Sequence, residues 1–158
     1  MPLSNPIFKQ ISRIVDRMGL EAYAVGGYVR DYYLHRPSSD IDVVVVGSGV
    51  AVAEELGRRL SAKVTIFKTY GTAMLRWRDT EVEFVGARRE SYTPESRNPH
   101  VEPGTLEDDQ RRRDFTINAM AWSLNGVRFG ELVDPFGGME DLEACIIRTP
   151  CEPDRTFS

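Results

Sequence analysis

The run DIDVVVVG at residues 40–47 constrains the fold of this chain more than any other feature. Its four valines are β-branched and apolar, which predicts a central strand that is covered on both faces. Asp40 and Asp42 open the run and flank a single isoleucine. Since successive strand residues point to opposite faces, both carboxylates are expected on one side, about 6.6 Å apart along the strand. A strand suited to burial therefore presents two acids together.

These two carboxylates have two explanations. Carboxylates at this spacing repel each other, and a divalent cation such as Mg²⁺ or Mn²⁺, bound by oxygen ligands, would compensate their charge. Alternatively, Asp40 and Asp42 are solvated at an exposed strand end, where charged residues usually lie. The apolar run behind them and the polar Pro-Ser-Ser segment before them favour the metal site.

A third carboxylate is offered by TEVEFVGA at residues 80–87, another strand candidate. Glu83 alternates there with apolar residues, and Glu81 would point the same way. Three carboxylates from two neighbouring strands would form a two-metal site around the attacking and leaving oxygens of a phosphoryl transfer. Taken alone, Glu83 is more typical of a half-exposed strand acid.

A pair of glycines, Gly26 and Gly27, separates the strand candidate EAYAV from the helical pattern YVRDYYL. Without β-carbons, glycines allow close backbone approach, and free N–H groups at the start of a helix can receive a triphosphate. A tight strand-to-helix turn explains a double glycine equally simply.

Composition limits the class of protein. A chain of 158 residues with 41% hydrophobic and 28% charged residues fits one compact domain. No apolar run approaches eighteen residues, and the N-terminus lacks a signal peptide pattern, so we expect a cytoplasmic protein with no membrane contact. The net charge of −4 argues against a generally basic nucleic-acid surface, although a local patch at 111–113 remains. Cys145 and Cys151 are interpreted as reduced bystander thiols, and His35 and His100 as surface loop residues.

The remaining patterns predict an α/β domain with helices packed on a mixed, mainly antiparallel sheet of about five strands. A long polar segment at 88–106 is expected to be an exposed, mobile loop that is either an irregular connector or moves during nucleotide selection. The tail offers a short strand pair and a short helix from about Met139. The other predicted helices cover 5–18, 28–34, 49–60 and 106–124, and the other predicted strands cover 21–25, 40–47, 63–67, 72–77, 81–87 and 145–149.

Four motifs occur together in this chain: GG-x-VRD at 26–31, DID at 40–42, RRDFTINAMA at 112–121 and DPFGG at 134–138. In this combination the chain resembles, over about residues 22–150, the catalytic head of the family of class II CCA-adding tRNA nucleotidyltransferases and bacterial poly(A) polymerases. The resemblance implies the nucleotidyltransferase-superfamily fold.

The resemblance also implies roles for individual residues. Asp40 and Asp42 match the family's metal-binding acids, and Glu83 matches its third carboxylate. Gly26 and Gly27 match the phosphate-contacting turn, and Arg30 and Asp31 match an Arg-Asp pair that supports the metal loop. Further positions match the site of the incoming nucleotide, where Asn118 either binds it or serves packing: Arg112, Arg113 and Asp114. A solvated helix face is the alternative for these arginines.

The implied reaction is attack by an RNA 3′-hydroxyl on the α-phosphate of ATP or CTP, with Mg²⁺ or Mn²⁺ as cofactor and the tRNA 3′ end as partner. The family continues after the head into a base-reading motif and then neck, body and tail domains, so residues 1–158 are expected to be one head domain with little activity by itself. Poly(A) addition, CC-only addition and A-only addition share every motif seen here. A noncatalytic nucleotide-binding module is the alternative of another class.

Overall fold

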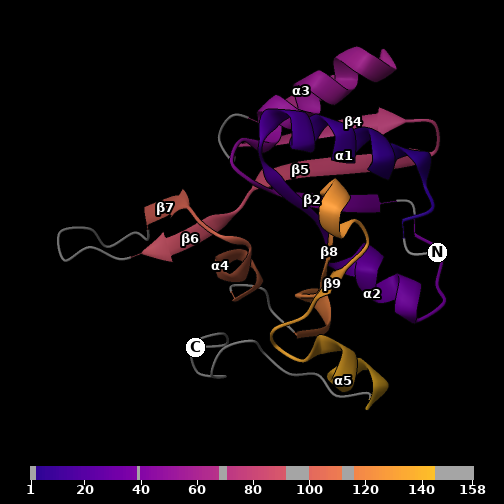
Figure 1. Cartoon of the computed structure of the whole chain (residues 1–158), viewed down its shortest axis with the longest axis vertical. Coiled ribbons are helices and arrows are strands. Elements are labelled where there is room, and N and C mark those ends of the chain that lie inside the picture. Colours follow the sequence, from indigo (N-terminus) through magenta and orange to yellow (C-terminus); the bar gives the residue numbers. More distant parts are fainter. Residues whose placement is uncertain (1–2, 39, 68–70, 92–99, 112–115, 145–158) are drawn as a thin grey trace.

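The computed structural model describes residues 3–38, 40–67, 71–91, 100–111 and 116–144 (Figure 1). Its main feature is a mixed seven-stranded sheet with the strand order β3-β4-β5-β2-β1-β8-β9. The strands of this sheet are β1 (Glu21–Val25), β2 (Asp40–Val46), β3 (Val64–Phe67), β4 (Thr72–Trp77), β5 (Thr80–Gly86), β8 (Ala121–Ser123) and β9 (Leu132–Val133). The helices are α1 (Pro6–Met18), α2 (Gly27–Tyr33), α3 (Gly49–Leu60), α4 (Leu106–Arg111) and α5 (Gly138–Glu143), with 3₁₀ turns η1 (Thr116–Asn118) and η2 (Gly126–Arg128).

The sheet confirms the predicted mixed and mainly antiparallel pairing. Strand β2 runs parallel to β5, whereas all other neighbours within the sheet pair antiparallel. Strands β4 and β5, expected over 72–77 and 81–87, form a hairpin that turns at Arg78 and Asp79. The sheet has seven strands where about five were expected, because the short strands β8 and β9 extend it beyond β1.

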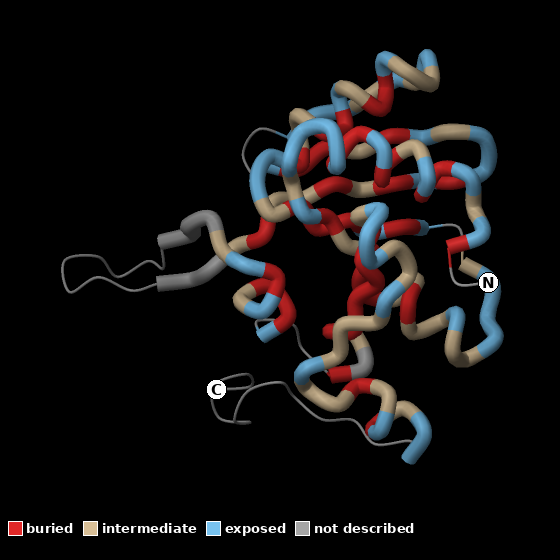
Figure 2. The backbone as a smooth tube through the Cα atoms, viewed as in Figure 1, coloured by how far each residue is buried: buried red, intermediate tan, exposed pale blue. Residues whose placement is uncertain are grey.

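One face of the sheet carries the main hydrophobic core beneath α1 and α3. Helix α1 begins where Asn5 accepts a hydrogen bond from the Ile7 backbone N–H at 3.0 Å, and it ends at the left-handed Gly19. These two residues set the bounds of the helix that was predicted over 5–18. Figure 2 shows the buried segments concentrated in the central strands and in the parts of the helices that face them. Three side chains of β2 enter this core: Ile41, Val43 and Val45.

The opposite face is covered less completely. A smaller cluster of buried apolar residues lies there, contributed by β1, β2 and β8 together with Leu106 of α4. Its members are Val25, Val44, Ala87, Leu106 and Ala121. Because strand residues alternate, the residues of β2 that share this face with Val44 include Asp40 and Asp42. The partly covered face of the sheet therefore carries the candidate acids.

Two predicted segments differ from the structure. The segment 88–106 was expected to be a loop, but its ends form an antiparallel strand pair, β6 (Arg88–Ser91) with β7 (His100–Pro103), that extends away from the main sheet (Figure 1). The helix expected over 106–124 ends at Arg111, and Ala121–Ser123 forms β8 instead. Pairing with β1 and β9 and burial from both sides override the helical preference of this Ala-Met-rich stretch.

None of the helices in the described part of the chain is both long enough and apolar enough to cross a membrane.

Candidate active site

The acids predicted from the sequence lie side by side on two parallel strands. In the pairing of β2 with β5, Asp40 is opposite Glu81 and Asp42 is opposite Glu83. Partners in neighbouring strands point to the same face, so four carboxylates form two rows on the open side of the sheet. Asp40 and Asp42 are exposed and Glu83 is half-buried, while the intervening residues Ile41 and Val82 are fully buried. The apolar residues between the acids thus fix their direction.

The environment of Glu83 changes the acidity of its carboxyl group. Its partial burial and the neighbouring negative charge of Asp42 raise the pKa of Glu83 above its ordinary value, and Arg88 partly opposes this effect. The ionised form of Glu83 is therefore disfavoured until positive charge arrives. A divalent cation between Asp42 and Glu83 would supply that charge.

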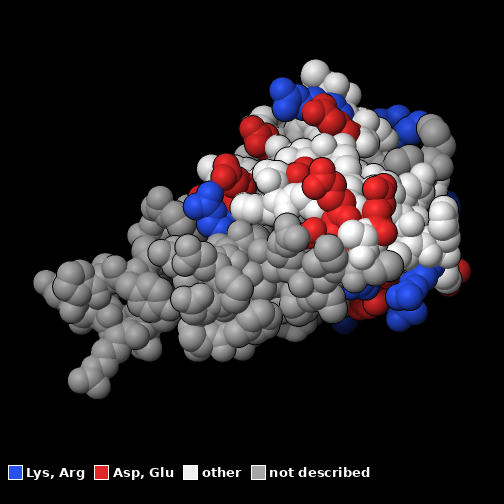
Figure 3. Space-filling model, turned by 90° about the horizontal axis from the view of Figure 1, so that it is seen from below, with Lys and Arg blue, Asp and Glu red and all other residues white. Residues whose placement is uncertain are grey.

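Oxygen donors of this kind fit Mg²⁺ or Mn²⁺. Among the residues with described positions, no three His, Cys, Asp or Glu side chains are gathered closely enough to form a complete metal site. Acidic side chains occupy the middle of the described surface seen from below, with basic side chains nearer its rim (Figure 3).

The predicted glycine turn lies directly beside the acids. Val25, the last residue of β1, pairs with Asp42, and the chain turns immediately afterwards at Gly26 into α2. Gly26 has φ 74° and ψ −138°, a conformation that residues with a β-carbon rarely adopt. A β-carbon at Gly27 would lie 3.3 Å from the Arg30 guanidinium. The two glycines thus allow a sharp turn next to Asp42.

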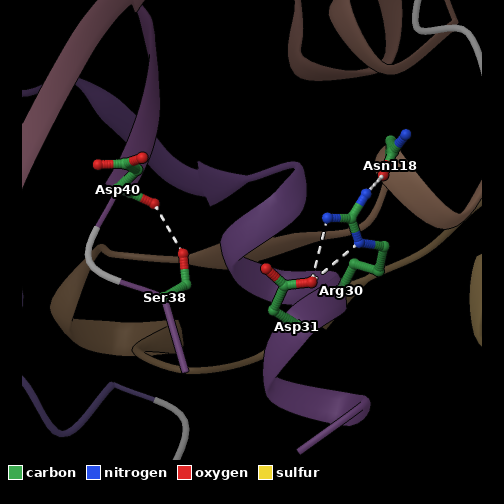
Figure 4. A network of polar contacts seen from close by, with 5 residues as sticks. All are labelled: Arg30, Asp31, Ser38, Asp40 and Asn118. Atoms are coloured by element: carbon green, nitrogen blue, oxygen red, sulfur yellow. Dashed lines mark hydrogen bonds and ion pairs between the residues drawn. The ribbon is translucent and has the colours of Figure 1, made fainter. Parts of the chain in front are cut away.

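Arg30 connects this turn to a distant part of the chain (Figure 4). Its Nη1 donates a hydrogen bond to Oδ1 of Asn118 at 2.9 Å, and its Nε donates to Oδ1 of Asp31 at 3.1 Å. Arg30 and Asn118, separated by 88 positions in the sequence, therefore meet beside the glycine turn. The Asn118 side chain thus accepts a hydrogen bond that holds the Arg30 guanidinium in place.

The segment before Asp40 is held by α2. The backbone N–H of Arg36 donates to the carbonyl of Asp31 at 2.9 Å. Further along, the Ser38 hydroxyl donates a long hydrogen bond of 3.5 Å to the Asp40 carbonyl (Figure 4). These contacts lie in the segment that leads from α2 into β2.

A group of buried polar contacts near Asn118 was missed by the sequence analysis. The side-chain amide nitrogen of Gln110 donates to the carbonyls of Ala119 at 2.7 Å and Val133 at 3.0 Å, and the Thr116 hydroxyl donates to the Asp141 carboxylate at 2.6 Å. In LEDDQ, Gln110 has the appearance of an ordinary helix surface residue, so no local signal marks its burial.

For another contact near Asn118 the sequence did contain a signal, the DPFGG motif. The Asp134 carboxylate accepts hydrogen bonds from the backbone N–H groups of Gly138 and Met139 at 2.7 and 2.8 Å. A β-carbon at Gly138 would collide with the Thr116 carbonyl, so α5 starts directly against η1. The motif therefore fastens the segment that carries Asn118.

The predicted nucleotide-binding residues Arg112, Arg113 and Asp114 lie outside the described residues, as do both cysteines and the strand candidate at 145–149. Arg111, immediately before them, forms an exposed ion pair with Glu107 at 2.8 Å.

Comparison with known protein families identifies the family of this chain. The family described as "Poly A polymerase head domain" matches residues 22–148, which include the acids, the glycine turn and Asn118. The chain belongs to this family. Enzymes of this nucleotidyltransferase family generally use divalent metal ions.

Individual relatives agree with the family assignment. The chain is 47% identical over 129 residues to an A-adding tRNA nucleotidyltransferase of Aquifex aeolicus (strain VF5), a match that covers 82% of this chain and 16% of the relative. It is 35% identical over 149 residues to the CCA-adding enzyme of Bacillus subtilis (strain 168), covering 93% of this chain and 36% of that enzyme. This chain therefore spans well under half the length of these relatives.

A solved structure confirms the fold. A tRNA nucleotidyltransferase complexed with a primer tRNA and an incoming ATP analog superposes with a TM-score of 0.80 at 44% sequence identity. The match covers 89% of this chain and 39% of that one. The nucleotidyltransferase fold predicted from the sequence is thus present.

Proposed function

We propose that this chain is the catalytic head of an enzyme that transfers nucleotides from ATP or CTP to the 3′ end of a tRNA and releases pyrophosphate. The observation that carries the proposal is the alignment of Asp40 and Asp42 with Glu83 on one open face, beside a glycine turn, in a chain of this family. The A-adding and CCA-adding activities named for its relatives support the choice of tRNA as the acceptor.

Asp40 and Asp42 would hold the divalent ions, with Glu83 as a further carboxylate ligand. Mg²⁺ is the expected ion, and Mn²⁺ would fit the same oxygen donors. When bound, such ions lower the pKa of the attacking hydroxyl and neutralise charge on the triphosphate. The protein then has to orient the RNA end and the nucleotide in line, which is the main protein contribution in phosphoryl transfer.

The incoming nucleotide would lie on the β1 side of the acids. Gly26 and Gly27 would accept the triphosphate at their turn, and Arg30, with its guanidinium against Gly27, would add positive charge there. Arg112, Arg113 and Asp114 would contact the ribose and phosphates, as the family resemblance implies. Asn118 would position Arg30 through their hydrogen bond.

Poly(A) addition is the second candidate, since the family description itself refers to poly(A) polymerase. It uses the same chemistry with a longer product. A noncatalytic nucleotide-binding module is the third, and it predicts nucleotide binding without transfer.

Asp42→Asn in the protein of natural length tests the proposed site. The substitution should lower nucleotide incorporation by roughly 100-fold or more, because metal-assisted charge stabilisation contributes several kcal/mol to the transition state. Glu54→Gln, the same chemical change at an exposed position on α3, serves as the control and should leave incorporation unchanged. Circular dichroism should show that both variants fold. Full activity of Asp42→Asn would refute the metal assignment.

A further inference from the structure

Arg76 lies on the acid-bearing face but has no part in the site described so far. In the pairing of β4 with β5 it is opposite Glu81, which in turn is opposite Asp40 on β2. The neighbouring β4 residues Ala73 and Leu75 enter the main core on the other face, so Arg76 points to the open side. Two strand spacings put its Cα about 10 Å from that of Asp40.

The side chain of Arg76 is exposed and available to a ligand. Within the described part of the chain, no hydrogen bond or ion pair joins Arg76 to another side chain. Arg78, two positions later in the same hairpin, differs in this respect because its guanidinium lies 4.2 Å from the ring centre of Trp77. Trp77 packs against the main core on the opposite face, so Arg78 makes an aromatic contact that Arg76 lacks.

The strand order indicates which substrate Arg76 would meet. The acids of β2 and β5 lie between β4, which carries Arg76, and β1, which leads into the glycine turn. In an in-line transfer the bond to the attacking oxygen forms on the side of the phosphorus opposite to the bond that breaks to the leaving pyrophosphate oxygen. If the triphosphate lies toward the glycine turn, the attacking RNA end enters from the β4 side.

We propose that Arg76 is a positioning residue that binds a backbone phosphate of the RNA close to its reacting 3′ end. The proposal rests on the proposed function and adds to it the side from which the RNA enters. A guanidinium donates two parallel hydrogen bonds to a phosphodiester, which fixes orientation as well as position. A cation at this place also offsets the repulsion between the RNA phosphates and the four carboxylates.

The experiment measures nucleotide addition by the protein of natural length carrying Arg76→Gln, with Arg78→Gln as the control. Both variants remove one positive charge from the same hairpin. Arg76→Gln should raise the KM for RNA by about 5-fold while leaving kcat and the KM for the nucleotide unchanged. The dependence of RNA affinity on salt should also become shallower, by about 0.7 in the log-log slope expected for one single-strand phosphate contact.

The possible outcomes separate this proposal from the proposed function. An active wild type whose KM for RNA and salt slope are unaffected by Arg76→Gln would overturn the inference alone. A higher KM for the nucleotide in place of the RNA would overturn it too, because it would put Arg76 on the triphosphate side. An equal effect of Arg78→Gln would show only general electrostatics and would reject a specific contact. A folded wild type that transfers no nucleotide would overturn the proposed function together with this inference.

Discussion

At the scale of single residues, Glu83 shows how the fold prepares a carboxylate for a cation. Burial and the charge of Asp42 raise its pKa, so the folded protein disfavours its ionised form. Since the folded-state pKa exceeds the unfolded one, the stabilisation from protonated Glu83 is complete below the ordinary value of 4.5 and is lost as the pH rises through the raised pKa.

Glu83→Gln tests this description of the acid site. Without divalent ions, the free energy of unfolding of the variant relative to wild type should increase between about pH 4 and about pH 8, because glutamine has no charge to bury. Urea unfolding at the two pH values measures the difference. Glu54→Gln on α3, where the carboxylate is exposed, should show a smaller pH-dependent change. A pH-independent difference for Glu83→Gln would mean that its environment does not disfavour the charge.

The direction of Asp40, Asp42 and Glu83 was predictable because strand alternation has a strict period of two. Their exact neighbours depended on the register between β2 and β5, which the sequence did not specify. The contact between Arg30 and Asn118 joins residues 88 positions apart, and no local pattern predicts a pair at such a separation. The family resemblance marked both residues but not their bond.

At the scale of elements, Gln110 fastens the end of α4 to β9 and to the entry of β8. It is 1% exposed, and its amide nitrogen reaches two backbone carbonyls, those of Ala119 and Val133. In the sequence, Gln110 precedes the RRD motif and Thr116 follows it. The Thr116 hydroxyl donates a hydrogen bond to Asp141, so both flanking residues have buried polar contacts.

Gln110→Leu should lower the free energy of unfolding by about 1–3 kcal/mol, because leucine keeps the bulk but leaves buried carbonyls without their side-chain donor. Thermal or urea unfolding of the purified protein measures this loss. Glu107→Gln, at an exposed position of the same helix, should change stability by no more than about 0.5 kcal/mol. Equal effects of the two substitutions would show that the Gln110 hydrogen bonds contribute nothing.

The predicted elements succeeded where local signals were complete. Helix α1 has an asparagine cap, an apolar stripe and a glycine stop. Helix α3 begins after a serine cap, and β4 and β5 are joined by the short turn at Arg78 and Asp79. The prediction failed for β8, since Ala-Met-Ala-Trp is compatible with a buried helix or a buried strand and only pairing with β1 decides between them. The prediction also failed for β6 and β7, because in the part of the chain that the structure describes each of these strands pairs only with the other.

At the scale of the whole molecule, the two faces of the sheet differ in how they are covered. Helices α1 and α3 cover the face that carries the main core, in which Val29 of α2 is also buried, while α4 contributes Leu106 to the smaller cluster on the other face (Figure 1). One face therefore carries most of the buried apolar side chains, and the other carries the candidate acids. The chain spans 16% and 36% of the length of two relatives, so these two faces correspond to only a part of each relative.

The most direct measurement of the central claim is an extension assay with the protein of natural length. Transfer RNAs that lack CCA, CA or A at the 3′ end are incubated with each labelled nucleoside triphosphate and Mg²⁺, and the products are resolved to single nucleotides. We predict metal-dependent addition of C or A with release of pyrophosphate, and little addition by residues 1–158 alone. Long adenosine tails in place of a defined end would assign the poly(A) alternative. A folded, nucleotide-binding protein that extends none of these RNAs would contradict the account.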